Sequence, residues 1–341
     1  MEDLATEPGP DRFLAVDAGN SKTVALVVDR AGEVVGRGRG GRGDIYGADS
    51  IETAETAVFG AVEAAFADAG VQASGIRSAA FRLAGVDYPE DARFWDDRIT
   101  DRLDGLGPRS VKNDGFASLR LLDGTGVGVS ITVGTGPAIA ARSADGREEC
   151  SGWFVFDDLG GQGLGNSALA AACRDWMGIA PETRLGAALC EMFGVGDVWE
   201  LRHLFTKRFG ALPRTELWRA SRLVLGLADD GDPVARGIVD TQAAAFVRYA
   251  TWCSARVGVD LTTGELPVLL NGSVVTSEHP AMRTAITERL SAVAPTARVT
   301  VAHASPLRGV VLDALAEGGV TLTPALVARV RDDHPEGFLT T

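Results

Sequence analysis

A repeated pattern of short apolar strands and glycine-containing turns is the feature that most constrains the fold of this chain. The first copy runs from Phe13 to Gly38, as three strand-like segments joined by two polar turns. The second copy starts at Gly126 and repeats the order of strand, turn, strand, turn and strand up to Trp153. Two copies with turns at matching places predict an internally duplicated α/β protein.

The first turn of each copy has the composition of a phosphate-binding loop. Glycine and asparagine tolerate positive φ and let backbone N–H groups converge on an anion, and hydroxyl and ammonium groups add donors. Asp17, at the end of the first strand, is a residue type that holds a hydrated metal ion. An ordinary β-hairpin with a polar turn is the alternative, and one copy alone does not separate the two. The residues predicted to bind ATP phosphates are Gly19, Asn20, Ser21, Lys22, Thr23, Gly134, Thr135 and Gly136.

Composition limits the class of protein. A chain of 341 residues favours two lobes around a cleft. A net charge of −13 argues against nucleic acid or an anionic membrane as the main partner. The four cysteines form no CxxC pair and predict buried thiols in a reducing compartment. We find no signal peptide and no apolar run of membrane-spanning length, so we expect a cytoplasmic protein.

The order of predicted elements gives the expected domains. Residues 1–11 are predicted to be a disordered tail, residues 12–115 a first lobe, and residues 116–341 a second lobe with a helical insertion. The glycine- and arginine-rich run from Arg37 to Gly47 is predicted to be a flexible loop over a substrate site. Ser50 is the predicted N-cap of a helix that Gly70 ends, and Ser167 is predicted to begin the first helix beyond Gly165.

Six short motifs, in this order along the chain, resemble those of the BadF/BadG-type ATPase and N-acetylglucosamine kinase family, within the actin, hexokinase and Hsp70 superfamily. The motifs are Asp17–Thr23, Leu83–Asp91, Asn113–Asp114, Val133–Pro137, Leu270–Val274 and Pro306–Gly309. The resemblance implies an α/β fold of two ribonuclease H-like lobes, with ATP in the interlobe cleft. It also implies Mg²⁺ held near Asp17 through water, and a homodimer.

The resemblance also implies roles for individual residues. Asp114 matches the aspartate that acts as catalytic base in the sugar kinases, although Asn-Asp pairs more often cap helices or form turns. Gly272 and Ser273 match the loop that binds adenosine. The residues expected to bind the substrate are Asp44, Asp87, Asn113, Trp153 and Gln162.

One departure from the family pattern affects the expected substrate. The family usually carries an aspartate and a glutamate where this chain has Gly161 and Gln162. Asp157 and Asp158 lie just upstream and are candidates to replace the missing acids, as is Asp44 in the loop expected to close over the acceptor. The sequence therefore leaves the identity of the acceptor open.

Three classes of function follow from these observations. The first is an ATP-dependent kinase that phosphorylates a hydroxyl of a sugar or sugar-like molecule, such as an amino sugar, hexose or cyclitol. The second, which the family resemblance also implies, is an ATPase that activates a partner reductase or dehydratase, for which Cys150 and Cys173 are the candidate ligands of an iron–sulfur cluster. The third is a non-catalytic sugar sensor, which would need neither Asp17 nor Asp114.

Overall fold

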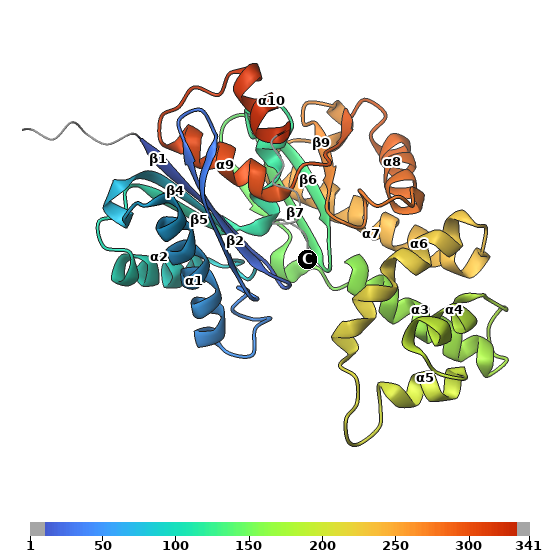
Figure 1. The fold of residues 1–341 in the computed structure, drawn as a ribbon. Coiled ribbons are helices and arrows are strands. Elements are labelled where there is room, and N and C mark those ends of the chain that lie inside the picture. The colour runs from blue at the N-terminus through green and yellow to red at the C-terminus, as the bar shows by residue number, and fades with distance from the viewer. Residues whose placement is uncertain (1–10, 333–341) are drawn as a thin grey trace, which may run out of the picture. The chain divides into compact units, whose positions relative to one another are not determined.

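The computed structural model describes residues 11–332, which divide into two compact units (Figure 1). Unit 1 contains the chain up to Gly126 and again from Ala304 onward, and unit 2 is Val127–His303. The expected division into 12–115 and 116–341 is therefore wrong for the C-terminal segment, which belongs to unit 1. Apart from Asp11, the predicted disordered tail lies outside the described residues.

Each unit is built on a five-stranded sheet, and the two sheets have the same topology. Unit 1 has the order β3-β2-β1-β4-β5, with bounds β1 Arg12–Ala18, β2 Thr23–Asp29, β3 Val34–Gly40, β4 Ile76–Leu83 and β5 Arg109–Asn113. Unit 2 has the order β8-β7-β6-β9-β10, with bounds β6 Gly128–Val133, β7 Pro137–Arg142, β8 Glu148–Cys150, β9 Val268–Asn271 and β10 Val299–Val301. In both, the first three strands are antiparallel, and the first strand pairs in parallel with the fourth. The predicted duplication is confirmed.

Helices cover both faces of the sheet in unit 1. On one face, α1 (Ile51–Ala69) and α2 (Pro89–Arg102) pack on a core of strand residues, with Trp95 fully buried. Ser50 caps α1, accepting a hydrogen bond from Thr53 N, and Gly70 ends it in the left-handed conformation, as the sequence predicts. On the other face lies α9 (Pro306–Glu317), followed by α10 (Pro324–Asp332).

A buried ionic network attaches α9 to the sheet and explains why the C-terminal segment belongs to unit 1. Arg82 on β4 is fully buried, and its guanidinium lies 2.7 Å from Asp313 and 3.1 Å from Glu317 on α9. Arg120 pairs with the other oxygen of Asp313. Because a buried charge without its partner is costly, this network requires α9 to lie on this sheet. The partners are more than 190 positions apart in sequence, so sequence periodicity does not reveal them.

Part of the predicted glycine- and arginine-rich loop is instead strand β3. Gly36, Gly38 and Gly40 alternate with arginines and lie on the face covered by α1. A Cβ atom on Gly38 would lie 1.7 Å from the carbonyl oxygen of Ala61 in α1. The alternating glycines therefore let helix and strand approach closely, while Arg37 and Arg39 are exposed.

This close approach gives a test of the fold. We expect Gly38→Ala to lower the free energy of unfolding by about 1–3 kcal/mol, because the methyl group forces α1 away from β3. Gly60 in α1 is the matched control, since a Cβ there meets nothing within 4 Å. Gly60→Ala should raise stability by about 0.5–1 kcal/mol through helix propensity. Urea unfolding of both variants measures the difference, and equal stability of the Gly38 variant and the parent would contradict the close packing.

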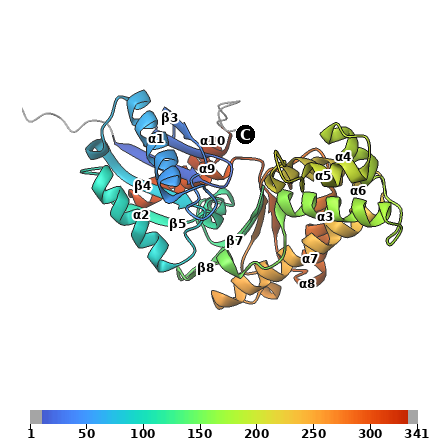
Figure 2. The same cartoon turned by 90° about the horizontal axis from the view of Figure 1, so that it is seen from below.

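Unit 2 contains the predicted helical region. Its helices are α3 Gly160–Trp176, α4 Leu185–Phe193, α5 Val198–Leu204, α6 Ser221–Asp229, α7 Pro233–Arg256 and α8 Ala281–Val293. Figure 2 shows α3 to α6 gathered together, while α7 packs on β6 and β7. Two predicted elements differ: α3 begins at Gly160 rather than at Ser167, and the strand expected to reach Trp153 ends at Cys150. Across residues 11–332, the helices lack the combination of length and apolarity that would cross a bilayer.

Candidate functional site

An acidic cluster lies at one edge of the sheet in unit 1. Strands β1, β4 and β5 are parallel, so their carboxyl ends meet at the same edge. Asp17 is the penultimate residue of β1 and Asp87 follows β4. Asn113 is the last residue of β5, and Asp114 follows it directly. The structure thus brings together four residues that the sequence predicted to act together.

Hydrogen bonds fix the orientation of this cluster. Asn113 Nδ2 donates to Asp87 Oδ1 at 2.7 Å, and Asn113 Oδ1 accepts from the backbone N–H of Gly115 at 2.8 Å. One side chain therefore holds the Asp87 carboxylate and also caps the 3-10 turn, Asp114–Phe116, that carries Asp114. Asn-Asp pairs often cap helices or turns, and in this pair Asn113 is the residue that does so.

The crowded carboxylates shift one another's protonation. Burial raises the pKa of Asp114 to about 8, and the negative charges of Asp17, Asp87 and Asp44 add to this shift. Burial and the neighbouring Asp91 and Asp44 raise the pKa of Asp87 to about 6. A carboxyl group with a pKa near 8 is mostly protonated at pH 7, and as the pH rises through 8 it becomes a carboxylate of high proton affinity. Asp114 therefore has the proton affinity that a general base needs.

Asp17 has the surroundings of a residue that binds one cation. Burial raises its pKa to about 6, and the nearby Lys22 only partly offsets that rise. Mg²⁺ commonly binds through one or two carboxylates, with water and substrate phosphates completing its shell. The half-buried carboxylate of Asp17, next to the predicted phosphate turn, fits such an ion. Among the described residues, no three or more His, Cys, Asp or Glu side chains are arranged to hold a metal ion.

The first predicted phosphate turn, Gly19–Lys22, is closed by a hydrogen bond from Gly19 N to Lys22 O at 2.9 Å. A Cβ on Gly19 would meet nothing within 4 Å, so the backbone here is open to a ligand. The predicted role of the Thr23 hydroxyl as a phosphate donor is wrong. Thr23 pairs with Ala18 and faces α1, fully buried, with its Oγ1 beside Gly43. Period-two alternation turns this side chain to the face opposite that of Asp17.

The segment Arg42–Gly47 is attached to this turn and is not a free loop. Asn20 Nδ2 donates to Asp44 Oδ2 at 2.7 Å, and Arg42 Nε donates to the carbonyl oxygen of Asn20 at 2.7 Å. Asp44 Oδ1 also accepts from the backbone N–H of Tyr46 at 2.9 Å, and Asp44 is buried. Asp44, which was predicted to bind substrate, therefore holds the segment Arg42–Gly47 against the first phosphate turn.

In unit 2, the second phosphate turn lies against the start of α3. The carbonyl oxygens of Gly134 and Thr135 accept from the backbone N–H groups of Gly161 and Gln162, both at 2.9 Å. Gly160 has a φ of 76°, and a Cβ there would lie 2.8 Å from the turn's backbone. Gly161 and Gln162, which stand where the family usually carries acids, therefore lie in the first turn of α3. Their backbone N–H groups support the second phosphate turn.

The predicted adenosine loop lies next to the same turn. Gly272 follows β9 with a φ of 99°, and a Cβ there would lie 2.5 Å from the carbonyl oxygen of Val133. The backbone N–H of Val274 donates to that same oxygen at 3.0 Å. Ser273 is exposed. The parallel strands β6 and β9 therefore bring the predicted ATP-binding residues of unit 2 to one edge.

In unit 2, the predicted substrate residue Gln162 and the candidate replacement acid Asp158 already have protein partners. Gln162 Nε2 donates to Asn166 Oδ1 at 3.2 Å and to Arg214 O at 2.8 Å. Asp158 Oδ2 accepts from Asn166 Nδ2 at 2.8 Å. Trp153 is exposed on a 3-10 turn, Gly152–Phe154.

Asp157, the other candidate to replace the missing acids, is tied to α7. It accepts from Tyr249 Oη at 2.7 Å and pairs with Arg248 at 3.3 Å. Both upstream aspartates therefore have protein partners within unit 2.

Two residues that sequence reasoning missed support the acidic cluster. Asp91 caps α2 and accepts from the backbone N–H groups of Asp87 and Tyr88, at 3.1 and 2.8 Å. Tyr46 donates its hydroxyl proton to the other oxygen of Asp91 at 2.8 Å. Pro89 followed by an acid in the first helical turn is a capping signal from which the role of Asp91 could have been predicted. No local signal links Tyr46 to a residue 45 positions away.

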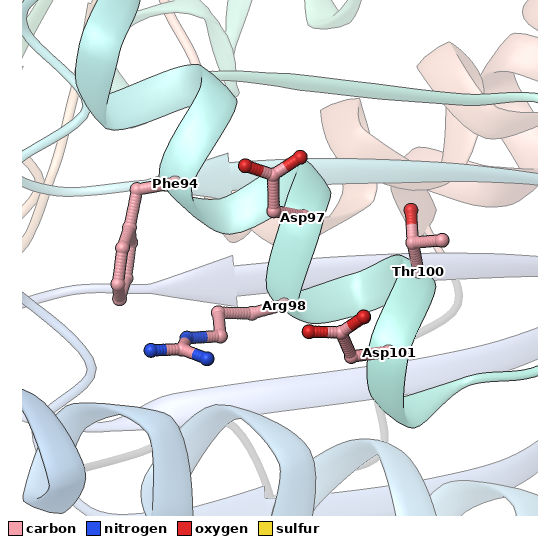
Figure 3. Close-up of a pocket in the computed structure, with 5 residues that line it drawn as sticks. All are labelled: Phe94, Asp97, Arg98, Thr100 and Asp101. Atoms are coloured by element: carbon pink, nitrogen blue, oxygen red, sulfur yellow. The ribbon is translucent and has the colours of Figure 1, made fainter.

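A separate hollow lies along α2. Figure 3 shows its lining residues, Phe94, Asp97, Arg98, Thr100 and Asp101, which enclose about 450 Å³. Arg98 pairs with Glu55 at 2.9 Å and lies over the ring of Phe94. The hollow shares no residue with the acidic cluster, and we assign it no role.

Comparison with protein families decides the relationship that the motifs suggest. The profile of the BadF/BadG/BcrA/BcrD ATPase family matches residues 14–315. The chain belongs to this family. Among proteins with curated descriptions, none matches the sequence.

Several proteins of known structure share the fold. The proposed N-acetylglucosamine kinase of Chromobacterium violaceum is 22% identical, with a TM-score of 0.68 over 89% of this chain and 99% of that one. That of Porphyromonas gingivalis is 20% identical, with a TM-score of 0.65 over 91% and 100%. A ROK family glucokinase of Streptomyces griseus, in complex with glucose and AMPPNP, is 19% identical, with a TM-score of 0.57 over 89% and 98%. This family member therefore has the actin/hexokinase-like ATPase fold expected from its sequence.

Proposed function

We propose that this ATPase family member is an ATP-dependent kinase that phosphorylates a hydroxyl of a sugar or sugar-like small molecule. The observation that carries the proposal is the acidic cluster of unit 1. Asp114, with a pKa of about 8, is positioned to accept the hydroxyl proton, and Asp87, held by Asn113, offers a carboxylate to sugar hydroxyls. A protein with this fold binds glucose together with an ATP analogue, which supports the same pairing of ligands here.

The phosphate turns and Asp17 supply the nucleotide side of this proposal. Lys22 and the open backbone at Gly19 suit terminal phosphates, while the turn at Gly134–Gly136 and the loop at Gly272 offer backbone groups in unit 2. Bound Mg²⁺ would neutralise charge that develops on the transferred phosphoryl group. Asp17 would hold that ion through its shell of water.

The metal assignment predicts the behaviour of Asp17→Asn. We expect this variant to need a higher Mg²⁺ concentration for half-maximal activity, because a neutral amide attracts a hydrated dication less than a carboxylate does. A titration of activity against Mg²⁺ at saturating ATP measures the shift, with Asp29→Asn at the end of β2 as the matched control. Identical titrations of the parent and Asp17→Asn would show that Asp17 is not the metal anchor.

For the acceptor, we propose a modified sugar, a cyclitol or another polyol rather than N-acetylglucosamine. A hydrogen bond to a charged group contributes about 1.5–3 kcal/mol, so the loss of a carboxylate lowers affinity about tenfold to a hundredfold. Gly161 has no side chain, and the Gln162 amide is bonded to Asn166 and Arg214. Asp157 and Asp158 have other partners.

An ATP-consumption screen tests both the kinase activity and the class of acceptor. The panel contains N-acetylglucosamine, N-acetylmannosamine, glucose, myo-inositol and adenosine, and product is identified as the phosphomonoester. Phosphorylation of any sugar or cyclitol supports the kinase. A kcat/KM for N-acetylglucosamine above that of every other acceptor would contradict the acceptor class, and ATP hydrolysis with no phosphorylated product across the panel would contradict the kinase.

The activator alternative is disfavoured by the chemistry of the cysteines. Iron–sulfur ligation needs thiolates. Burial raises the pKa of the thiol of Cys173, one of the two candidate ligands, so iron must displace a proton that is held more tightly there than in an ordinary thiol. An iron and sulfide assay of protein purified without oxygen checks this, and stoichiometric iron would revive the alternative.

A further inference from the structure

Tyr46 occupies a position that the proposed reaction does not by itself explain. It belongs to the segment Arg42–Gly47, and its ring is half-exposed beside Gly85, where a Cβ would lie 3.1 Å from the ring edge. Gly85 has a φ of 78° and starts the loop that carries Asp87. An exposed ring lying along a loop excludes water from that side of the loop, and its hydroxyl is directed to a buried carboxylate.

The hydroxyl of Tyr46 reaches Asp91, which organises the loop of Asp87. Asp91 is buried, and one of its oxygens accepts from the backbone N–H groups of Asp87 and Tyr88. Its other oxygen accepts from Tyr46 Oη at 2.8 Å. Tyr46 therefore restrains the carboxylate that fixes the backbone at Asp87, while Asn113 restrains the side chain of Asp87.

The other end of the same segment is fixed to the phosphate turn. Asp44, two residues before Tyr46, accepts from Asn20 Nδ2 and from Tyr46 N. Arg42 donates to the carbonyl oxygens of Asn20 and Gly47. A continuous set of hydrogen bonds thus runs from Asn20 through Asp44, Tyr46 and Asp91 to the backbone of Asp87.

We propose that Tyr46 is a positioning residue: by its hydrogen bond to Asp91 it holds Asp87 at a fixed place relative to the phosphate turn. This inference rests on the proposed function, in which Asp87 binds the acceptor and Asn20 the nucleotide. Fixing the two segments to each other orients the acceptor hydroxyl toward the phosphoryl group, and small misplacements of a reacting group cost large factors in rate.

Tyr46→Phe removes the hydroxyl and keeps the ring, so it isolates the bond to Asp91. Tyr88→Phe is the matched control, because Tyr88 lies in the same loop and its hydroxyl makes no hydrogen bond within residues 11–332. The acceptor is the compound of the screening panel that the unmodified enzyme phosphorylates with the highest kcat/KM. We expect Tyr46→Phe to raise the KM for that acceptor and to lower kcat, so that kcat/KM falls at least about tenfold. The Kd of AMPPNP measured without acceptor should stay unchanged in both variants.

Hydrogen exchange provides a readout that needs no substrate. We expect the backbone amides of Asp87 and Tyr88 to exchange faster in Tyr46→Phe than in the parent or in Tyr88→Phe, because Asp91 is less restrained.

Equal exchange and an equal acceptor KM in the two variants would overturn the role of Tyr46. A general loss of AMPPNP affinity and thermal stability in Tyr46→Phe would overturn it too, since that result indicates a structural role only. If the unmodified enzyme phosphorylates nothing in the panel, the proposed function fails, and the exchange rates alone decide whether Tyr46 holds the loop.

Discussion

Asp114→Asn should lower kcat by about 10²–10⁴-fold while leaving ATP affinity close to that of the parent. An amide cannot accept the hydroxyl proton. Burial, with a further contribution from the neighbouring carboxylates, raises the pKa of Asp114 to about 8, the highest in the cluster. Steady-state kinetics with the best acceptor, together with AMPPNP binding, separate the two effects. In the parent, kcat/KM should rise with pH up to about 8, because the free enzyme must lose this proton before it can act as a base.

The same substitution should stabilise the protein at neutral and alkaline pH. The folded-state pKa of Asp114 is about 8 and its ordinary value is 3.8, so between these values the folded state keeps a proton that the unfolded state has lost. The contribution of Asp114 to stability therefore falls as pH rises through this interval, and it is least favourable above pH 8. Asparagine has no proton to lose, so the Tm difference between Asp114→Asn and the parent should grow from about pH 4 to pH 8.

Asp123→Asn is a control for both measurements, because Asp123 is an exposed turn residue of the same unit that accepts from Thr125. It should alter neither kcat nor the pH dependence of Tm. A nearly normal kcat in Asp114→Asn would show that Asp114 serves only the turn in which it lies.

Gly136→Val should weaken ATP binding by at least about tenfold to a hundredfold without unfolding the protein. A Cβ on Gly136 would meet nothing within 4 Å, so the branched side chain projects into open space at the second phosphate turn. There it would prevent phosphate oxygens from approaching the backbone N–H groups, and each hydrogen bond lost to a charged group costs about 1.5–3 kcal/mol. Calorimetric titration with AMPPNP measures the loss.

Two further glycines separate blocked binding from lost folding. Gly237 in α7 also has open space at its Cβ position, so Gly237→Val should keep both Tm and AMPPNP affinity. Gly160 has a φ of 76°, and its Cβ would collide with Gly136 from within the structure, so Gly160→Val should lower Tm. If Gly136→Val bound AMPPNP as tightly as Gly237→Val does, the second turn would not contact phosphates.

The sequence by itself determined the features that depend on neighbouring residues. Strand periodicity and turn composition predicted the duplicated strand order, which the two sheets share. The cap at Ser50 and the termination at Gly70 predicted α1, because capping depends on side chains within one helical turn. The Asn113–Asp114 motif was also recognisable from the sequence, and the structure places it at the carboxyl end of β5, which is parallel to β4.

Tertiary structure alone decided which faces meet and which distant groups pair. The alternating glycines of β3 were predicted as a loop, because only the packed helix α1 reveals why a strand should lack side chains there. Thr23 was predicted to bind phosphate. It pairs with Ala18, the residue next to Asp17, so its side chain lies on the face of the sheet opposite to that of Asp17. Arg82 with Asp313, and Tyr46 with Asp91, join residues far apart in sequence. Such pairs leave no local pattern, because the free energy that selects them arises only when the folded chain buries both partners.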